Sequence, residues 1–233
     1  VMPDLIDRLR LICQADEYGY KQYKPAFNRY LKGLRESVND NVSVDDAINM
    51  LAQQIVTKPI FLKLFGEEGF VMKNTVSQTI DAMLKKIDTK EGLKDIDEKL
   101  SDFYQSVERT LDNVETVEGK QKVITSLYEK FFKNAFPKDQ AINGVVYTPQ
   151  EISDFMIRSA AEVLKKEFGV SISDEGVNIL DPFTGTGTFI ARMMESGLIP
   201  NDDLERKYHN EMYANEITLL AYYIANVNIE NTY

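Results

Sequence analysis

The chain has 233 residues, of which 43% are hydrophobic and 27% are charged, and its formal net charge is −10. This composition is ordinary for a soluble globular protein, and the length suffices for one large domain or two modest ones. No apolar run approaches the roughly 20 residues of a membrane span. We therefore expect no contact with a membrane. The one cysteine, Cys13, excludes an internal disulfide and predicts a cytoplasmic protein, because the cytoplasm is reducing.

The composition also limits the chemistry that the chain can perform. It contains one histidine, His209, and no cluster of cysteines and histidines. We therefore expect no metal site and no Ser-His-Asp or Cys-His centre. Because duplex DNA is bound largely by lysines and arginines that displace counterions, the acidic net charge predicts weak or no DNA binding by this chain alone.

Residues 1–143 are predicted to be nearly all helical. The run Ser43-Val44-Asp45-Asp46 resembles a capping box, and Asn74 is a second candidate helix cap. Hydrophobic residues recur every three or four positions, as on the buried face of a helix, and longer helices are expected over 93–111 and 119–136. This spacing is what helix–helix packing requires, and composition assigns no chemistry to this half.

The second half, 144–233, begins with a change of pattern. Gly144-Val145-Val146-Tyr147 is rich in β-branched and aromatic residues, which favour extended chain. Pro149 suits the first turn of a helix, and the amphipathic run 150–168 follows it. The sequence therefore predicts a domain boundary between residues 143 and 144 and a helix over 150–168.

The layout of a nucleotide-type cofactor site follows. A short strand is predicted over 177–180 and a helix over 190–196, and between them lies Asp181-Pro182-Phe183-Thr184-Gly185-Thr186-Gly187-Thr188-Phe189. Gly185 and Gly187 can adopt backbone angles closed to residues with a Cβ, and the free N–H groups of the following helix would face a ligand. The third glycine of the dinucleotide fingerprint and the lysine of a P-loop are absent. A tight turn without a ligand is the alternative.

A second short strand is predicted over 211–217, and it ends with Glu216 and Ile217. In wound α/β sheets, an acid at the end of the second strand accepts hydrogen bonds from ribose hydroxyls. The apolar residue after the acid can cover an adenine ring. The alternative for Glu216 is an exposed acid at a strand end. A last helix is expected over 218–229.

These segments resemble the gamma class of adenine-N6 DNA methyltransferases, in which the target-recognition region follows the catalytic domain. Tyr147-Thr148-Pro149 resembles motif X of that family, 181–189 its motif I, and Asn215-Glu216-Ile217 its motif II. The resemblance implies S-adenosyl-L-methionine as the cofactor and an incomplete α/β Rossmann-like domain with its first strands only. The cofactor-binding residues that it implies are Tyr147, Thr148, Pro149, Asp181, Pro182, Phe183, Thr184, Gly185, Gly187, Thr188, Phe189, Glu216 and Ile217.

The same family needs a motif IV, of the form D/N/S-P-P-Y/F, which holds the target amine and stacks on a base flipped from the duplex. The seven prolines of this chain include no adjacent pair. Motif IV is therefore missing, and no catalytic residue is assigned. We expect a piece of a longer enzyme that carries the cofactor half of the site and is inactive by itself.

The first half resembles the coupler region of the single-chain Type ISP restriction–modification enzymes. The likeness lies in 45–59 and in 118–137. It implies that a nuclease and an ATP-driven, helicase-like motor precede the coupler, and that methyltransferase and target-recognition domains follow it in one polypeptide. It also implies that the helical bundle 1–143 is a spacer between motor and methyltransferase.

The sequence thus predicts part of a DNA adenine-N6 methyltransferase within a bacterial restriction–modification polypeptide, which meets DNA through the rest of that polypeptide. Two alternatives stay open. One is a non-catalytic helical interaction module. The other is a methyltransferase that uses the same cofactor on RNA or protein, for which a similar motif IV is expected.

Overall fold

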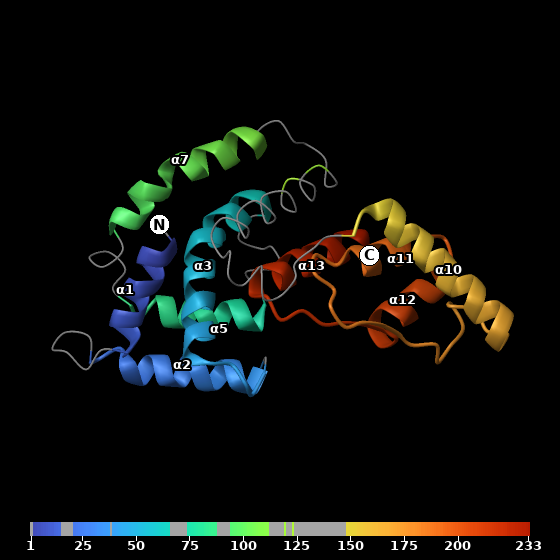
Figure 1. The fold of residues 1–233 in the computed structure, drawn as a ribbon, viewed down its shortest axis with the longest axis horizontal. Coiled ribbons are helices and arrows are strands. Elements are labelled where there is room, and N and C mark those ends of the chain that lie inside the picture. Colours follow the sequence, from blue (N-terminus) through green and yellow to red (C-terminus); the bar gives the residue numbers. More distant parts are fainter. Residues whose placement is uncertain are drawn as a thin grey trace. The chain divides into compact units, whose positions relative to one another are not determined.

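The computed structural model describes residues 2–14, 21–37, 39–65, 74–87, 94–111, 119, 123 and 148–233. The chain divides into two compact units, Val1–Thr116 and Val117–Tyr233 (Figure 1). The domain boundary predicted between residues 143 and 144 lies outside the described residues. So do Tyr147 and most of the helix predicted over 119–136.

The described residues of the first unit form helices and no strand. They are α1 (Met2–Gln14), α2 (Lys24–Ser37), α3 (Val44–Phe65), α5 (Thr75–Leu84) and α7 (Lys94–Leu111). Helix α3 is central, because α1, α2, α5 and α7 all contact it. The bounds of α7 confirm the helix predicted over 93–111 to within one residue. Fully buried side chains of the core include Leu5, Leu9, Phe27, Leu34, Ile48 and Leu51.

Helices α3 and α5 are capped as the sequence predicts. The Ser43 Oγ accepts a hydrogen bond from the Asp46 N–H at 3.1 Å, and the Asp46 carboxylate accepts one from the Ser43 N–H at 2.9 Å. This reciprocal pair is a capping box. The Asn74 Oδ1 accepts hydrogen bonds from the N–H groups of Val76 and Ser77. Because these donors have no partner within the helix, the caps determine where α3 and α5 begin.

A buried polar contact joins α3 to α5. The Gln54 side chain is almost fully buried, and its Nε2 donates to Ser77 Oγ at 2.9 Å and to Asp81 Oδ1 at 3.2 Å. Lys58 of α3 donates to the other carboxylate oxygen of Asp81 at 2.8 Å. Since a buried amide without partners is unfavourable, these bonds favour one alignment of the two helices over others.

The second unit combines helices with a parallel pair of strands. Its described elements are α10 (Gln150–Phe168), β1 (Ile179–Asp181), α11 (Thr188–Glu195), α12 (Asn201–Asn210), β2 (Met212–Ala214) and α13 (Leu219–Thr232). Leu180 of β1 lies opposite Tyr213 of β2, and α11 and α12 form the crossover that parallel strands require. Helix α10 has the predicted bounds, and both strands are shorter than predicted.

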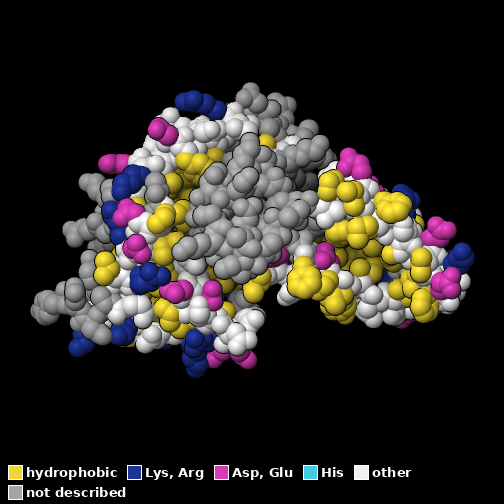
Figure 2. Space-filling model, in the orientation of Figure 1, with side chains coloured by type: hydrophobic (Ala, Val, Ile, Leu, Met, Phe, Trp, Pro, Cys, Tyr) yellow, Lys and Arg dark blue, Asp and Glu magenta, His cyan; other side chains and the backbone are white. Residues whose placement is uncertain are grey.

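One face of the two strands carries the core of the second unit. Ile179 and Met212, which are paired in register, pack against a buried cluster made of Ile157, Ile172, Met193 and Ile199. Successive side chains of a strand point to opposite faces, so Leu180 and Tyr213 face the other way and are exposed. Figure 2 shows hydrophobic side chains gathered on the visible surface of this unit.

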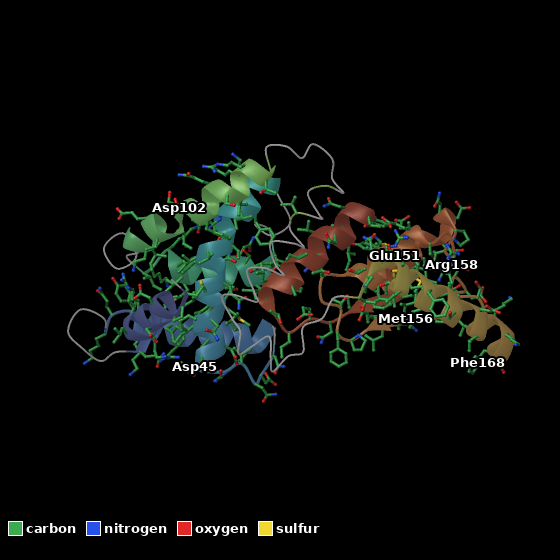
Figure 3. The ribbon with its side chains drawn as sticks, turned by 45° about the horizontal axis from the view of Figure 1, so that its top comes forward. Asp45, Asp102, Glu151, Met156, Arg158 and Phe168 are labelled. Atoms are coloured by element: carbon green, nitrogen blue, oxygen red, sulfur yellow. The ribbon has the colours of Figure 1, made fainter. Side chains whose placement is uncertain are left out.

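Helix α10 packs against α11 and is held there by an ion pair. The Arg192 guanidinium donates two hydrogen bonds to the Asp154 carboxylate, at 2.7 and 2.8 Å, and this contact lowers the pKa of Asp154. Ile157 faces inward, whereas Met156 and Phe168, labelled along α10 in Figure 3, are exposed. The helix ends at Gly169, whose φ of 74° provides the left-handed C-cap.

A buried ionic cluster fixes the N-terminal ends of both strands. The side chain of Lys207 is fully buried, and its Nζ donates to the carbonyls of Asp174 and Val177 and to the Glu211 carboxylate, each at 2.7 Å. Glu211 also accepts from the Gly176 N–H at 2.7 Å, while its own carbonyl accepts from the Ile179 N–H at 2.8 Å.

The same cluster explains why β1 starts later than the sequence predicts. The Val177 N–H donates to the Asp174 carbonyl in a turn, and the Val177 carbonyl accepts from Lys207. Both backbone groups are therefore occupied before the sheet begins.

Among the described residues, no helix has the length and apolarity to cross a membrane.

Candidate cofactor-binding site

The candidate site begins where β1 ends. Asp181 is the last residue of the strand, and its Oδ1 accepts a hydrogen bond from the Phe183 N–H at 3.3 Å. Its Oδ2 is buried and has no hydrogen-bond partner among the described residues. Pro182 is exposed, and the Phe183 ring is 88% exposed. The end of β1 thus places the unpaired Asp181 Oδ2 at the start of the glycine loop.

The two glycines form a tight corner between β1 and α11. Gly185 has φ of 56° and Gly187 has φ of 79°, in the left-handed region that favours glycine. The Gly187 N–H donates to the Thr184 carbonyl at 2.8 Å, and Gly187 is the N-cap of α11. The predicted order of strand, glycine turn and helix is therefore present, and α11 begins at Thr188 rather than at the predicted residue 190.

Glu216 lies across this corner. Its Oε2 accepts a hydrogen bond from the Gly185 N–H at 2.9 Å, and its Oε1 accepts one from the Thr218 N–H at 2.7 Å. The structure thus brings together the acid of the second strand segment and the first glycine of the loop, 31 positions apart in the sequence. Ile217, the next residue, is 70% exposed and is free to cover a flat ligand.

Asn215 connects the two segments through the backbone. Its N–H donates to the Asp181 carbonyl at 2.9 Å, and its carbonyl accepts from the Thr184 N–H at 3.0 Å. Its side-chain amide donates to the Pro182 carbonyl at 3.1 Å. These bonds extend the parallel pairing beyond β1 and β2, so the position of Glu216 relative to the loop is fixed by the sheet.

Several buried polar atoms around the loop have no partner. Thr184 is buried and its Oγ1 makes no hydrogen bond with the described residues, as is also true of Asp181 Oδ2 and of Asn228 Oδ1 on α13. Leaving such an atom unsatisfied costs about 1–3 kcal/mol. A ligand with polar groups would remove that cost at Asp181 and Thr184. The residues present therefore fit a polar small molecule at this corner.

The remaining predicted residues lie around the loop or at its margin. Thr148 and Pro149 lie at the N-terminus of α10, where the Pro149 carbonyl accepts from the Ile152 and Ser153 N–H groups at 3.0 Å. Phe189 packs against the hydrophobic core of the unit. The Thr188 and Thr186 hydroxyls are 3.3 Å apart. No hydrogen bond in the described part of the chain joins Thr148 or Pro149 to the glycine loop.

Sequence reasoning missed the residues that support the loop from α13. The Asn228 Nδ2 donates to the Thr186 carbonyl at 2.8 Å. A Cβ added to Gly187 would lie 3.0 Å from Ala225 Cα, so α13 packs directly on the second glycine. Asn228 is one of several polar residues in α13, so no signal in the sequence singled it out, and its partner could not be identified without the fold.

Two family models together match residues 3–230 of this chain. The family model described as "Type ISP restriction-modification enzyme, coupler domain" matches residues 3–119. The model described as "N-6 DNA Methylase" matches residues 119–230. The comparison with curated proteins found no match.

Three solved structures are similar to this chain. The DrdV–DNA complex, determined by cryoEM, is 34% identical with a TM-score of 0.81, and the match covers 100% of this chain and 23% of that chain. A nuclease-deletion mutant of the Type ISP restriction–modification enzyme LlaGI in complex with a DNA substrate mimic is 39% identical, with a TM-score of 0.75. The match covers 99% of this chain and 21% of that chain. The ATP-dependent Type ISP restriction–modification enzyme LlaBIII bound to DNA is 39% identical, with a TM-score of 0.77. The match covers 99% of this chain and 16% of that chain. The chain thus spans less than a quarter of these relatives.

Proposed function

The chain belongs to the Type ISP restriction–modification enzymes, and from this premise we propose that its second unit binds S-adenosyl-L-methionine for the methylation of adenine N6 in DNA. A coupler domain and an N6 DNA methyltransferase domain are both present in the chain. The family of the second domain implies this methyl donor. The nuclease, the ATP-driven motor and the target-recognition domain are proposed for the whole polypeptide, as is its cytoplasmic location.

The contact between Glu216 and Gly185 carries this proposal. It aligns an acid, a glycine corner and the exposed Ile217 at the ends of two parallel strands, where ligands bind in open α/β sheets. Each carboxylate oxygen has more than one acceptor position, so Glu216 can bind ribose hydroxyls while it holds the backbone. Ile217 then covers the adenine ring. We further propose that β1 and β2 are the first strands of a larger Rossmann-like sheet.

The unpaired atoms suggest how the rest of the ligand is oriented. Asp181 Oδ2 and Thr184 Oγ1 are buried without partners, and both can accept hydrogen bonds. They suit a cationic or hydroxyl-bearing part of the ligand. By family resemblance, Thr148 and Pro149 lie beside the methionine moiety and Tyr147 belongs to the same motif. The exposed Phe183 ring is available to the same ligand.

Catalysis in this domain consists mainly of positioning the reactants. When bound, S-adenosyl-L-methionine supplies an electrophilic methyl group on a sulfonium. An effective local concentration of the two reactants can account for about 7–11 kcal/mol of a barrier, and here Glu216 and the residues of the glycine loop would hold the cofactor in place. The sequence contains no adjacent prolines and hence no motif IV to hold the target amine. We propose that this chain alone binds the cofactor without turnover.

The net charge of −10 favours DNA binding through other parts of the polypeptide, because duplex binding depends on cationic side chains. The first unit then acts as a spacer that transmits force and geometry between motor and methyltransferase. Its extensive helix packing around α3 suits that role. Filter binding at moderate salt should detect little affinity of this chain for duplex DNA, and sub-micromolar binding would overturn this part of the proposal.

Calorimetry with S-adenosyl-L-methionine and its demethylated product tests the proposal directly. The wild-type chain should bind both. Hydrogen bonds to a charged group contribute about 1.5–3 kcal/mol, so Glu216→Ala should weaken binding by about ten- to a hundredfold. Glu205→Ala, which removes an exposed carboxylate of α12, is the matched control and should bind as the wild type does.

Two results would count against the proposal. Absence of binding by the wild-type chain would favour a non-catalytic helical interaction module. Binding that Glu216→Ala leaves unchanged would remove Glu216 from the site. A methyltransferase for RNA or protein is distinguished by the acceptor: the complete polypeptide should methylate duplex DNA, and methylation of RNA or protein alone would contradict the assignment to DNA.

A further inference from the structure

Helix α13 supports the glycine corner at Thr186 and Gly187, the residues that follow the Gly185 contact with Glu216. The Asn228 side chain donates from Nδ2 to the Thr186 carbonyl at 2.8 Å, across 42 positions of sequence. Thr186 is 2% exposed and lies between the two glycines. Three residues before Asn228 on the helix, Ala225 lies against Gly187. The helix thus holds the centre of the corner by one hydrogen bond and one close packing contact.

The hydrogen bond from Asn228 acts on a single peptide plane. The Thr186 carbonyl and the Gly187 N–H belong to the same planar, trans peptide group. Asn228 holds the carbonyl end of that plane, and the Thr184 carbonyl holds the N–H end at 2.8 Å. The plane ends at Gly187, whose φ is positive, and a glycine can otherwise adopt many other backbone angles. Without Asn228, only one end of the plane is held.

The oxygen of the Asn228 amide indicates why an asparagine stands at this position. Its Oδ1 is buried and has no hydrogen-bond partner in the described part of the chain. A buried, unsatisfied oxygen is unfavourable. An apolar side chain of similar size would avoid it, and two nearby residues of α13, the adjacent Val227 and Ala225 three positions earlier, are buried and apolar. The benefit of an asparagine at this position therefore lies in its bond to Thr186.

We propose that Asn228 is a positioning residue, which holds the Thr186–Gly187 peptide so that the corner keeps the shape in which it binds the cofactor. It does not touch the cofactor itself. The proposal rests on the proposed function for its effect on affinity, but its effect on the loop can be measured without any ligand.

The same helix offers a matched control. The Asn226 Nδ2 donates to the Tyr222 carbonyl at 2.7 Å, within α13 itself. Asn226→Leu therefore removes the same functional group from the same helix without touching the corner. Asn228→Leu removes the bond to Thr186 at similar volume. Asn228→Asp keeps the shape, replaces the donor with an anion, and repels the Thr186 carbonyl.

Two measurements test the proposal. The first is amide hydrogen exchange of the ligand-free chain: Asn228→Leu should accelerate exchange of the Gly185 and Gly187 amides by about tenfold, the loss of one ordinary hydrogen bond. The second is calorimetry with S-adenosyl-L-methionine, in which Asn228→Leu should weaken binding by about tenfold and Asn228→Asp by more. Asn226→Leu should change either quantity by less than about twofold.

The two measurements separate this inference from the proposed function. If the wild-type chain fails to bind the cofactor, exchange alone decides: faster exchange in Asn228→Leu supports the positioning role, and unchanged exchange overturns it. If the wild type binds, equal affinity and equal exchange in wild type and Asn228→Leu overturn it. Equal effects of Asn226→Leu and Asn228→Leu on the corner amides would also overturn it, since they would reflect a general loosening of α13. Should Asn228→Leu fail to fold, Asn228→Ser removes the amide without added bulk and gives the same readings.

Discussion

Gly187 and Ala225 lie so close together that a Cβ on Gly187 would be 3.0 Å from Ala225 Cα and 3.1 Å from the Ala225 carbonyl oxygen. The corner and α13 therefore meet backbone to backbone. Such atoms cannot move aside as the end of a flexible side chain could. The position of the glycine corner is thus tied to a helix that lies more than thirty residues later in the sequence.

The first prediction concerns this contact. Gly187→Ala should destabilise the second unit by about 2–4 kcal/mol, because it adds left-handed strain at φ of 79° and a clash with backbone. Gly197→Ala is the control: Gly197 has φ of 73° and nothing within 4 Å of the added Cβ, so only the strain, about 1–2 kcal/mol, remains. Urea denaturation followed by circular dichroism measures the free energy of unfolding of both variants. Equal losses of stability would show that Ala225 moves to accommodate the added Cβ, and would contradict this prediction.

The second prediction concerns pH. Hydrogen bonds from Lys207 and from the Gly176 N–H lower the pKa of Glu211 from 4.5 to about 2. Because this pKa is lower in the folded state, the stabilisation by the carboxylate is fully present above about pH 4.5 and is lost as the pH falls through about 2. The stability difference between wild type and Glu211→Gln should therefore be largest near neutral pH and should shrink below pH 4.5.

Denaturation curves between pH 6 and pH 2.5 measure that difference. Glu205→Gln, which changes an exposed carboxylate of the adjoining helix, is the control and should differ little from wild type at every pH. A difference between wild type and Glu211→Gln that stays constant down to pH 2.5 would contradict the assignment of the lowered pKa to the Lys207 contact.

The third prediction compares two neighbouring glutamines of the coupler. Gln54→Leu should destabilise the first unit by about 1–3 kcal/mol, because the buried Ser77 hydroxyl loses its donor and Asp81 keeps its bond from Lys58 but loses the one from Gln54. Gln53→Leu should be neutral or stabilising, because the Gln53 Oε1 is buried and unsatisfied and an apolar side chain removes that atom. Thermal denaturation of the two variants tests the contrast, and a larger loss for Gln53→Leu than for Gln54→Leu would refute it.

Much of the fold could be predicted from the sequence, because its signals act within one turn of helix or one short loop. The cap at Asn74 and the capping box of Ser43 depend on residues three positions away, and both are present. The bounds of α10 follow from Pro149 at one end and Gly169 at the other. The segments for the glycine corner and for Glu216 were recognisable as motifs, and the family of both halves is confirmed.

The local signals also had limits. The strand predicted over 177–180 begins at Ile179, because the Val177 backbone is occupied by a turn and by Lys207. Nothing in the sequence around Lys207 indicates that this lysine is fully buried. A charged residue becomes buried only where partners from other segments converge on it, and here those partners come from the loop before β1 and the residue before β2.

The sequence by itself thus determined most of the described helices, though not α12, together with the caps, the motifs and the family of this protein, since each depends on residues close together along the chain. The tertiary structure alone decided that Glu216 bonds to the Gly185 amide, that Asn228 holds the Thr186 carbonyl and that Ala225 leaves no room for a side chain at residue 187. The reason is physical: these contacts join segments 31 to 42 positions apart. Their geometry is set by the parallel pairing of β1 with β2 and by the packing of α13 against α11, which no local pattern specifies.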